Sequence, residues 1–293
     1  MSFTYNGTEV QGVTYNGTEV QQVTYNGTVV WEYAAPFDHN SYGDRNITTY
    51  FTSGDLTKDL AKGNFRNVKV GDYINLPSDA EIMGTTGVAK LFVLHADYFQ
   101  GKRSYNPSDM RHHLVVALGK GTPTSINALG NGSSVGKSSW GFDGGYNTGY
   151  YVSSGAVDVR ADIEAQVRAI EMLQNHILRH KIFAPGGEAS PSAQTPSYYV
   201  AEMNICEIDG YEANRVITDP TGFGAKTILE MFGDETEQFD YFRLGRFTYT
   251  KFKTRDHAGS AYYSPVVAGT GASNTTYTKT DTLFPLIPYF LLY

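Results

Sequence analysis

Two histidines at helical spacing are the first residues whose types suggest chemistry. His176 and His180 are four residues apart, a spacing that places two zinc ligands on one face of a helix. A metalloprotease also needs a glutamate directly after the first histidine, but Ile177 occupies that position. We therefore interpret both histidines as cations near a helix C-terminus, where the helix dipole favours them, and we predict no metal site. The pair His112 and His113 precedes an apolar run and is likewise interpreted as structural.

A glycine-rich segment, Gly132–Ser138 (GSSVGKS), is the nearest approach to a phosphate-binding loop. In the phosphate-binding motif, four residues separate the first glycine from the Gly-Lys pair. Here only three residues separate Gly132 from Gly136 and Lys137. No apolar strand precedes the segment and no helical pattern follows it, although the anion-binding geometry needs both. We expect no nucleotide cofactor, and no other cofactor.

An acidic segment at 234–240 (DETEQFD) lacks the alternating ligand spacing and the central glycine of a calcium loop. We interpret it as a solvated loop, with weak calcium binding as the alternative. No hydrolase triad is predicted. The two carboxylates of a glycosidase have no sequence signature, so that class stays as the weakest functional alternative. The sequence as a whole predicts a protein that is not an enzyme.

The composition excludes several classes of protein. The 293 residues include 23 Lys+Arg and 30 Asp+Glu, a net charge of −7, and 41% are hydrophobic, enough for a core. An acidic chain lacks the charge that drives phosphate-backbone binding, so no nucleic-acid partner is expected. Cys206 is the single cysteine, which excludes a disulfide scaffold. No signal peptide and no apolar stretch of about 18 residues is found, so no membrane insertion is expected.

Residues 3–32 contain a repeat with a period of ten: FTYNGTEVQG, VTYNGTEVQQ and VTYNGTVVWE. Asn-Gly between β-forming residues predicts a hairpin with a two-residue turn, because both turn positions need positive φ. The predicted register pairs Phe3 with Val10, Val13 with Val20, and Val23 with Val30. A short hairpin buries too little surface to be stable alone, so its apolar face must pack on another repeat, the main domain or other copies. The predicted assembly-interface residues are Tyr5, Val10, Tyr15, Val20, Tyr25 and Val30.

The remaining elements are predicted from periodicity. Apolar residues at a spacing close to 3.6 predict one long helix over 157–180, and shorter helices are predicted at 56–63 and 225–232. Predicted strands lie at 68–73, 88–98, 113–118, 198–208, 241–249, 261–267 and 287–293.

The expected organisation is a hairpin arm, a linker and one large domain. Residues 1–35 form the arm, for attachment or oligomerisation, the polar connector 36–49 forms the linker, and 50–293 form the domain. The fold class expected is α+β.

The body of the chain resembles a C-type-lectin-like domain found in phage and prophage tail-associated proteins of Gram-positive hosts. The similarity rests on the xGxFxxxxVGDY pattern within 59–76, on YNTGYYVSSGAVDVR (146–160) before the long helix, and on LEMFGDETEQFDYFRLG (229–245). The closing segment 257–293, with aromatic, Gly/Ser/Asn-rich and Pro-aromatic-Leu-Leu parts, is also similar. The calcium-dependent sugar-binding motifs Glu-Pro-Asn and Trp-Asn-Asp do not occur in the sequence, so the resemblance alone does not imply sugar binding.

The resemblance implies a phage structural protein, made in the bacterial cytoplasm and carried on the particle surface. A tail fibre or receptor-binding protein is the first hypothesis, and capsid decoration or a baseplate or tail cement role is the alternative. Expected partners are other copies of the chain, by resemblance as a trimer, neighbouring virion proteins, and a host surface glycan or protein. Exposed aromatic and amide side chains suit such binding, and the ligand-binding residues predicted are Tyr146, Tyr262, Tyr263, Asn274 and Tyr277.

Overall fold

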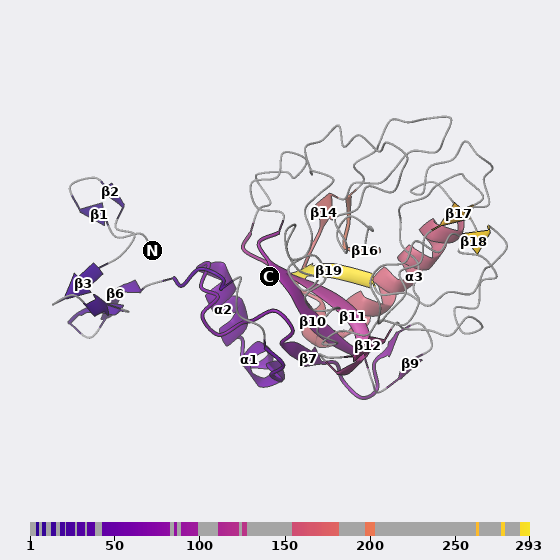
Figure 1. The fold of residues 1–293 in the computed structure, drawn as a ribbon, viewed down its shortest axis with the longest axis horizontal. Coiled ribbons are helices and arrows are strands. Elements are labelled where there is room, and N and C mark those ends of the chain that lie inside the picture. The colour runs from indigo at the N-terminus through magenta and orange to yellow at the C-terminus, as the bar shows by residue number, and fades with distance from the viewer. Residues whose placement is uncertain are drawn as a thin grey trace.

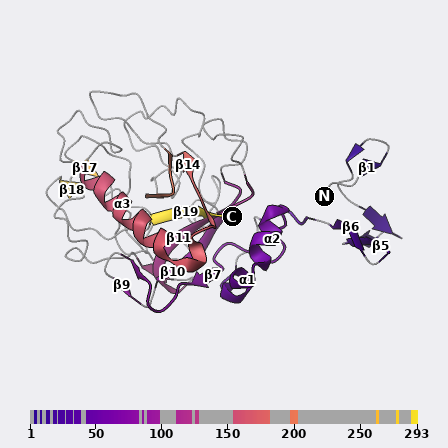
Figure 2. The ribbon, with the colours of Figure 1, turned by 180° about the vertical axis from the view of Figure 1, so that it is seen from behind.

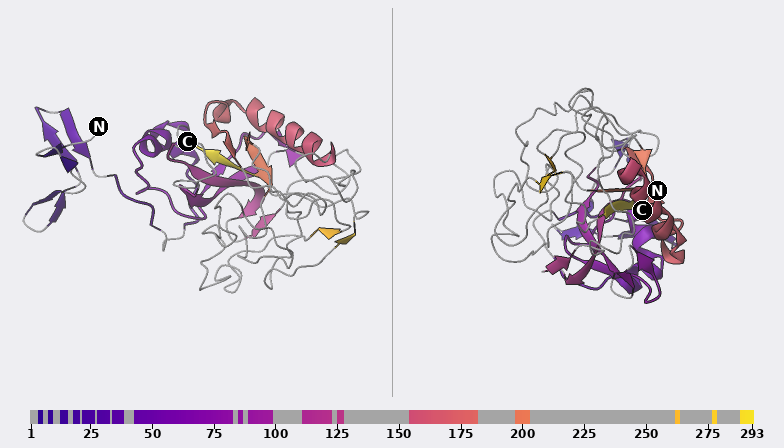
Figure 3. Two further views of the ribbon diagram at one scale, coloured as in Figure 1. Left: turned by 90° about the horizontal axis from the view of Figure 1, so that it is seen from above. Right: turned by 90° about the vertical axis from the view of Figure 1, so that its right-hand side faces the viewer.

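The computed structural model shows an α+β chain whose main sheet is antiparallel and curled (Figures 1 and 3). No helix among the described residues has the length and apolar character needed to span a membrane. The residues that the structure describes are 4–5, 8–9, 13–15, 18–20, 22–26, 28–32, 34–38, 43–82, 85–86, 89–98, 111–122, 125–127, 154–181, 197–202, 262–263, 277–278 and 288–293.

The repeats form three separate two-stranded hairpins, as predicted. In the second hairpin, Val13 pairs with Val20 and Tyr15 with Thr18, which confirms the predicted register. Asn26 has a φ of +49°, as expected for an Asn-Gly turn. The strands are β1 (Thr4–Tyr5), β2 (Thr8–Glu9), β3 (Val13–Tyr15), β4 (Thr18–Val20), β5 (Gln22–Tyr25) and β6 (Thr28–Glu32).

The third hairpin departs from the predicted register. Val23 pairs with Trp31 rather than with Val30, while Thr24 pairs with Val29. Val30 is therefore the extra residue of a β-bulge in β6. The alternation of apolar and polar residues along a strand could not predict this bulge. Val29, Val30 and Trp31 are all apolar, so an apolar residue lies opposite Val23 in the predicted register and in the observed one.

Two short helices open the body of the chain: α1 (Thr48–Thr52) and α2 (Asp55–Ala61). The predicted helix at 56–63 corresponds to α2, which buries Leu56 and Leu60. Gly63, with a φ of +69°, follows α2 and ends it in the left-handed conformation that glycine adopts without strain.

The main sheet has the strand order β13-β19-β11-β10-β7, with β12 paired to β11 and β16 paired to β19. The predicted strands at 88–98, 113–118 and 287–293 are confirmed as β10, β11 and β19. Bounds are β7 (Tyr73–Asn75), β10 (Ala89–Ala96), β11 (Leu114–Thr122), β12 (Ser125–Asn127), β13 (Ile177–Leu178), β16 (Val200–Glu202) and β19 (Pro288–Leu292).

The central strands are buried on both faces. Successive side chains of a strand point to opposite faces, and in β10 both Leu91 and Phe92 have no exposed surface. The same holds for Val115 and Val116 in β11. The continuous apolar runs in these strands are the sequence pattern expected of strands covered on both sides.

The predicted strand at 68–73 is mostly wrong. Val68 and Val70 are buried, but they precede β7, which begins only at Tyr73. Gly71 has a φ of +88°, so the backbone turns before the strand starts. Four further strands make two small ladders: β8 (Glu81–Ile82) with β9 (Thr85–Thr86), and β14 (His180–Lys181) with β15 (Ser197–Tyr198).

The long helix is shorter than predicted. It is α3 (Ser154–Ala169), which lies across one face of the sheet (Figure 2), and a 3₁₀ turn over Glu171–Leu173 follows it. Ile170 between them is extended, with a ψ of 112°. The chain then enters β13 and β14, so His176 and His180 do not share a helix face. The sequence predicted a longer helix because Leu173 and Ile177, which lie beyond its end, are also apolar and buried. Their spacing continues the helical period although the backbone is no longer helical.

The predicted linker contributes to the body. Phe37 and Ile47 are buried, and the Phe37 ring packs edge-on against Phe65 at 5.8 Å. The backbone N–H of Ala35 donates to the Asn64 side chain at 3.3 Å, and the N–H of Phe65 donates to the Ala35 carbonyl at 2.8 Å. The segment from 35 onward is thus attached to the loop after α2.

Asp72 connects this segment to the sheet. Its carboxylate has no exposed surface and accepts hydrogen bonds from Arg45 Nη2 at 2.6 Å and Arg45 Nε at 3.2 Å. The backbone N–H groups of Arg45 and Lys69 donate to it as well, at 3.1 and 2.9 Å. A Cβ on Gly43 would lie 2.1 Å from Asp72 Oδ1, so only glycine fits there. The VGDY segment therefore supplies a buried carboxylate that fixes the backbone of 43–46.

Candidate functional site

Three of the five predicted ligand-binding residues lie in one small ladder. Strands β17 (Tyr262–Tyr263) and β18 (Tyr277–Thr278) pair antiparallel, and Tyr263 is the partner of Tyr277. The backbone therefore brings these tyrosine positions together from segments that are separate in sequence. Tyr146 and Asn274 lie outside the described residues, as do the acidic segment 234–240, the predicted helix 225–232 and the predicted strand 241–249.

The predicted assembly residues that can be placed lie in the hairpins. Tyr15 and Tyr25 are 73% and 70% exposed, and Val20 is partly buried. The structure describes the backbone of Tyr5 and Val30, and Val10 lies outside the described residues. The arm thus presents tyrosine rings that this chain itself does not cover.

The glycine-rich segment also contains a hydrolase-like spacing. Residues 132–136 (GSSVG) match Gly-x-Ser-x-Gly, a pattern that marks a nucleophile only between a strand and a helix. The segment lies outside the described residues.

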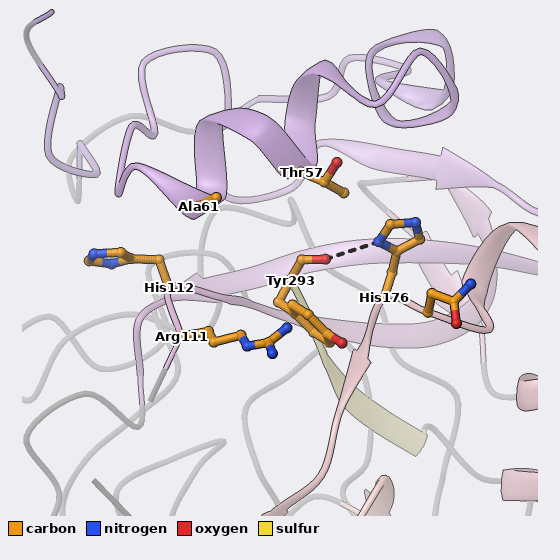
Figure 4. A pocket seen from close by; sticks show the side chains of 7 residues that line it. Thr57, Ala61, Arg111, His112, His176 and Tyr293 are labelled. Atoms are coloured by element: carbon orange, nitrogen blue, oxygen red, sulfur yellow. Dashed lines mark hydrogen bonds between the residues drawn. The ribbon is translucent and has the colours of Figure 1, made fainter. Parts of the chain in front are cut away.

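A cavity of about 550 Å³ opens where α2, the start of β11 and the end of β19 meet (Figure 4). It has the size of a small-molecule site, for which about 300–1,000 Å³ is usual. Side chains from four segments that are well separated in sequence meet here, at positions 57–61, 111–112, 175–176 and 293. The lining residues are Thr57, Ala61, Arg111, His112, Asn175, His176 and Tyr293.

His112 is held on one wall of this cavity by Asp97. The His112 Nδ1 atom lies 2.7 Å from Asp97 Oδ2, and this hydrogen bond raises the pKa of His112. Asp97 has a φ of +52° at the end of β10, and its other oxygen accepts the His113 N–H at 2.9 Å. One carboxylate therefore fixes the backbone of His113 and the ring of His112.

His113 has a different role from its neighbour. Its side chain has no exposed surface, and its Nδ1 lies 2.9 Å from the Arg111 carbonyl oxygen. Burial lowers the pKa of His113, because the interior disfavours its charged form. The structural interpretation holds for His113, whereas His112 lines the cavity.

Gly63 allows His112 to take its place. A Cβ on Gly63 would lie 2.8 Å from His112 Nε2, closer than any side chain could sit. The Phe65 ring meets the same imidazole edge-on at 6.1 Å. The Gly-x-Phe part of the sequence pattern thus shapes one wall of the cavity.

The opposite wall is built around Tyr293. The Arg111 guanidinium lies 4.5 Å from the centre of the Tyr293 ring, a cation–π arrangement visible in Figure 4. His176 pairs with the backbone of the same residue: the Tyr293 N–H donates to the His176 carbonyl at 2.9 Å, and His176 Nδ1 lies 3.3 Å from the Tyr293 carbonyl oxygen. The Phe51 ring packs edge-on against His176 at 5.4 Å.

The arrangement is rich in hydrogen-bond donors. A guanidinium, two imidazoles and an amide line one opening, whereas the Thr57 hydroxyl donates to the Gly54 carbonyl at 3.0 Å. Among the residues that the structure describes, no group of three His, Cys, Asp or Glu side chains could hold a metal ion. Among the described residues, nitrogen groups thus gather at this cavity beside the Tyr293 carbonyl oxygen.

Sequence reasoning found part of this cavity. The sequence drew attention to His112 and His176, but as structural residues. Arg111 and Tyr293 carry no spacing signal, because only the antiparallel pairing of β11 with β19 brings them together. The one signal available was the run Arg111-His112-His113 directly before a strand.

Comparisons with protein-family models, curated proteins and solved structures gave no match to this chain.

Proposed function

We propose that this chain is a structural protein of a phage particle that attaches the particle to its host, as a tail fibre or receptor-binding protein. In this proposal the hairpin arm binds neighbouring subunits, and the body is a C-type-lectin-like domain that presents the ligand surface. The protein is made in the bacterial cytoplasm and then carried on the particle surface.

The observation that carries the proposal is the exposure of Tyr15 and Tyr25 on isolated two-stranded hairpins. A two-stranded hairpin is at best marginally stable in water, and exposed aromatic rings gain free energy when another surface covers them. Each hairpin also has unpaired strand edges, to which a partner can add a strand. These features fit a repeat whose exposed aromatic rings are covered when it is assembled.

The body supports the second half of the proposal. The xGxFxxxxVGDY residues that carry the resemblance have packing roles: Gly63 contacts His112, Phe65 contacts Phe37, and Asp72 binds Arg45. The backbone pairing places the tyrosine positions 263 and 277 opposite each other, and tyrosine is a residue type often used to bind sugars or proteins.

The test uses purified full-length protein as a competitor of phage adsorption. We expect the wild-type chain to reduce adsorption to host cells, and Tyr263→Ala/Tyr277→Ala to compete more weakly. The matched control is Tyr198→Ala, a tyrosine in the separate ladder of β14 and β15. If the wild-type chain competes no better than an unrelated protein, the attachment role is wrong.

Capsid decoration is the second candidate, because the unpaired hairpin edges suit strand addition across neighbouring subunits as well as they suit a tail. Imaging of particles labelled on this chain separates the two functions. Label at the tail tip supports attachment, whereas label over the head supports decoration and contradicts the tail-fibre proposal.

A further inference from the structure

We propose that strand β3 of the hairpin arm is a docking edge for β3 of a second copy of this chain, so that two arms join into one antiparallel sheet. The strand order of that sheet is β4-β3-β3-β4, with a two-fold axis at Thr14. The inference rests on the assembly role proposed for the arm and names its partner. It is carried by the register of the second hairpin, the charges in its two strands and the length of the links between hairpins.

The first argument is the direction of the backbone groups in β3. Two residues separate Tyr15 from its partner Thr18, and the pair that flanks a two-residue turn is hydrogen-bonded within the hairpin. Hydrogen-bonded and non-hydrogen-bonded pairs alternate along an antiparallel ladder, so the next pair, Thr14 with Glu19, directs its N–H and C=O groups outward. No strand among the described residues pairs with β3 on its outer side, and Tyr15 at the end of β3 is 73% exposed. Thr14 is therefore the residue whose backbone can bond a further strand.

The second argument is that the neighbouring hairpins of the same chain cannot supply this strand. If β1 paired antiparallel with β3, β2 would run parallel to β3, and if β5 did so, β4 would run parallel to β5. Parallel strands of one sheet need a connection of about a dozen residues or more. Only residues 10–12 separate β2 from β3, and only residue 21 separates β4 from β5. The partner of β3 is therefore expected to come from another molecule.

The third argument is the charge pattern, which favours a second copy of β3 as that partner. β3 has no charged residue, whereas β4 has Glu19 at its centre. Antiparallel pairing of two β3 strands about Thr14 places Val13 of each copy opposite Tyr15 of the other, and β-branched residues opposite aromatic residues stabilise a sheet. Pairing of two β4 strands would place Glu19 opposite its own copy, where like charges are destabilising. Charged residues also protect edge strands, so the assembly is expected to end at β4.

The fourth argument is the stability of the joined sheet. Val13 pairs with Val20, and Tyr15 is two residues from Val13, so positions 13, 15 and 20 share one face of the hairpin. A two-fold axis perpendicular to the sheet keeps the same positions of the second copy on that face. The joined sheet thus has four strands and one largely apolar face, whereas a two-stranded hairpin is at best marginally stable. The two-fold axis predicts a dimer, in contrast to the trimer that the resemblance implies.

The test is disulfide cross-linking of the full chain with Thr14→Cys, oxidised with glutathione disulfide. In a hydrogen-bonded antiparallel pair the two Cα atoms are about 5.5 Å apart, which a disulfide can span. We expect Thr14→Cys to form a covalent dimer, seen on a non-reducing gel at twice the 32.3 kDa of one chain. The matched control is Glu19→Cys, on the other strand of the same hairpin, which should lose most of this product. The wild-type chain controls for cross-linking through Cys206.

Sedimentation equilibrium of the full chain measures the same pairing without a covalent bond. We expect a reversible dimer for the wild type. Thr14→Pro should raise the dissociation constant about tenfold or more, because it removes the outward N–H of β3 from both copies. Glu19→Pro removes the outward N–H of β4 instead and should leave the dissociation constant unchanged. Both prolines stand where the N–H faces away from the hairpin, a position that an edge strand tolerates.

Four outcomes would overturn the pairing. These are a wild-type chain that stays monomeric at every concentration, equal cross-linking of Thr14→Cys and Glu19→Cys, equal effects of the two prolines, and a mass that grows beyond two chains, as an open ladder of β3 on β4 would give. A monomeric wild type that still competes with phage adsorption would contradict the pairing and leave the attachment role intact. A dimer that does not compete would contradict the attachment role and leave the pairing intact.

Discussion

At the residue scale, Asp72 has the most hydrogen bonds of the carboxylates described above. Four donors reach it, two from the Arg45 side chain and two from backbone N–H groups. The hydrogen bond to Asp72 in turn raises the pKa of Arg45. Because Arg45 is half exposed and Asp72 is fully buried, water cannot replace the donors that surround the carboxylate.

Asp72→Asn should therefore destabilise the body by about 2–3 kcal/mol, because an amide retains only part of these charge-assisted bonds. Urea unfolding followed by circular dichroism measures the change. Asp55→Asn is the control: Asp55 pairs with Lys58 on the exposed face of α2, and its removal should leave the midpoint unchanged. Equal effects of the two variants would show that the Asp72 contacts add no stability.

The pair of His112 and Asp97 predicts a pH dependence of stability. The hydrogen bond with Asp97 raises the pKa of His112 above the unfolded value of about 6.5. A raised folded-state pKa means that the pair stabilises fully below about pH 6.5 and loses this stabilisation as the pH rises through the folded-state pKa. Because His112 is close to half exposed, solvent screens the effect.

We therefore expect His112→Gln to cost more stability at pH 5.5 than at pH 8.5, measured by urea unfolding of both proteins at each pH. Comparing the variant with the wild type cancels most of the opposite contribution of His113. Burial lowers the pKa of His113, so its contribution is complete above about pH 6.5 and is lost as the pH falls. A cost that is equal at the two pH values would contradict the ion pair.

At the element scale, the sequence predicts the elements that are defined by burial alone. The runs LFVL in β10 and LVVAL in β11 are apolar at every position, and both are central strands. The same reasoning extends α3 too far, because Ile170 and Leu173 keep the helical period while the chain has already left the helix. What ends α3 is the pairing of Ile177 and Leu178 with β19, a partner more than a hundred residues away that no local pattern contains.

The candidate cavity shows the same limit. Gly63, Arg111 and Tyr293 each have an unremarkable sequence context, and only the folded chain shows that they share one site. The hairpins are the opposite case, since an Asn-Gly turn fixes the register from within ten residues. Beyond the bulge at Val30, the turn no longer predicts which residues pair.

The turn after α2 gives a prediction about glycine. Gly63 and Gly54 both have left-handed backbones, with φ of +69° and +77°. A Cβ on Gly63 would collide with His112, whereas a Cβ on Gly54 would meet only Thr57 Oγ1 at 4.0 Å. Gly54→Ala should therefore cost about 1 kcal/mol from the backbone alone, and Gly63→Ala should cost about 1–2 kcal/mol more.

Thermal unfolding of the two variants measures this difference. The double variant Gly63→Ala/His112→Ala should cost less than the sum of its single changes, because the collision is gone. Additive costs would mean that the imidazole moves aside freely and that Gly63 does not hold it in place.

At the scale of the whole molecule, β19 is the strand on which the sheet depends. It pairs with β11 along one edge and with β13 and β16 along the other, and its residues Tyr289 to Leu292 are at most 1% exposed. The hairpins, in contrast, form separate ladders that share no strand with this sheet (Figure 1).

Deletion of 288–293 should therefore abolish the cooperative unfolding transition of the body, because it removes the central strand together with Tyr293. Deletion of 1–33 should leave that transition in place, since Phe37 is the first buried apolar residue among those whose burial the structure describes. Differential scanning calorimetry of both truncated proteins tests this. A cooperative transition that survives the first deletion would show that β11 and β13 are stable without β19.

The position of β19 also determines when the protein can fold during its synthesis. Its partner residues in β11 precede it by more than half of the 293 residues. While the ribosome translates the intervening chain, β11 has an apolar edge with no strand beside it, and such edges are where nascent chains aggregate. Pairings this distant in sequence also form slowly. The yield of folded protein should therefore depend on chaperones that protect that edge until residues 288–292 have left the ribosome.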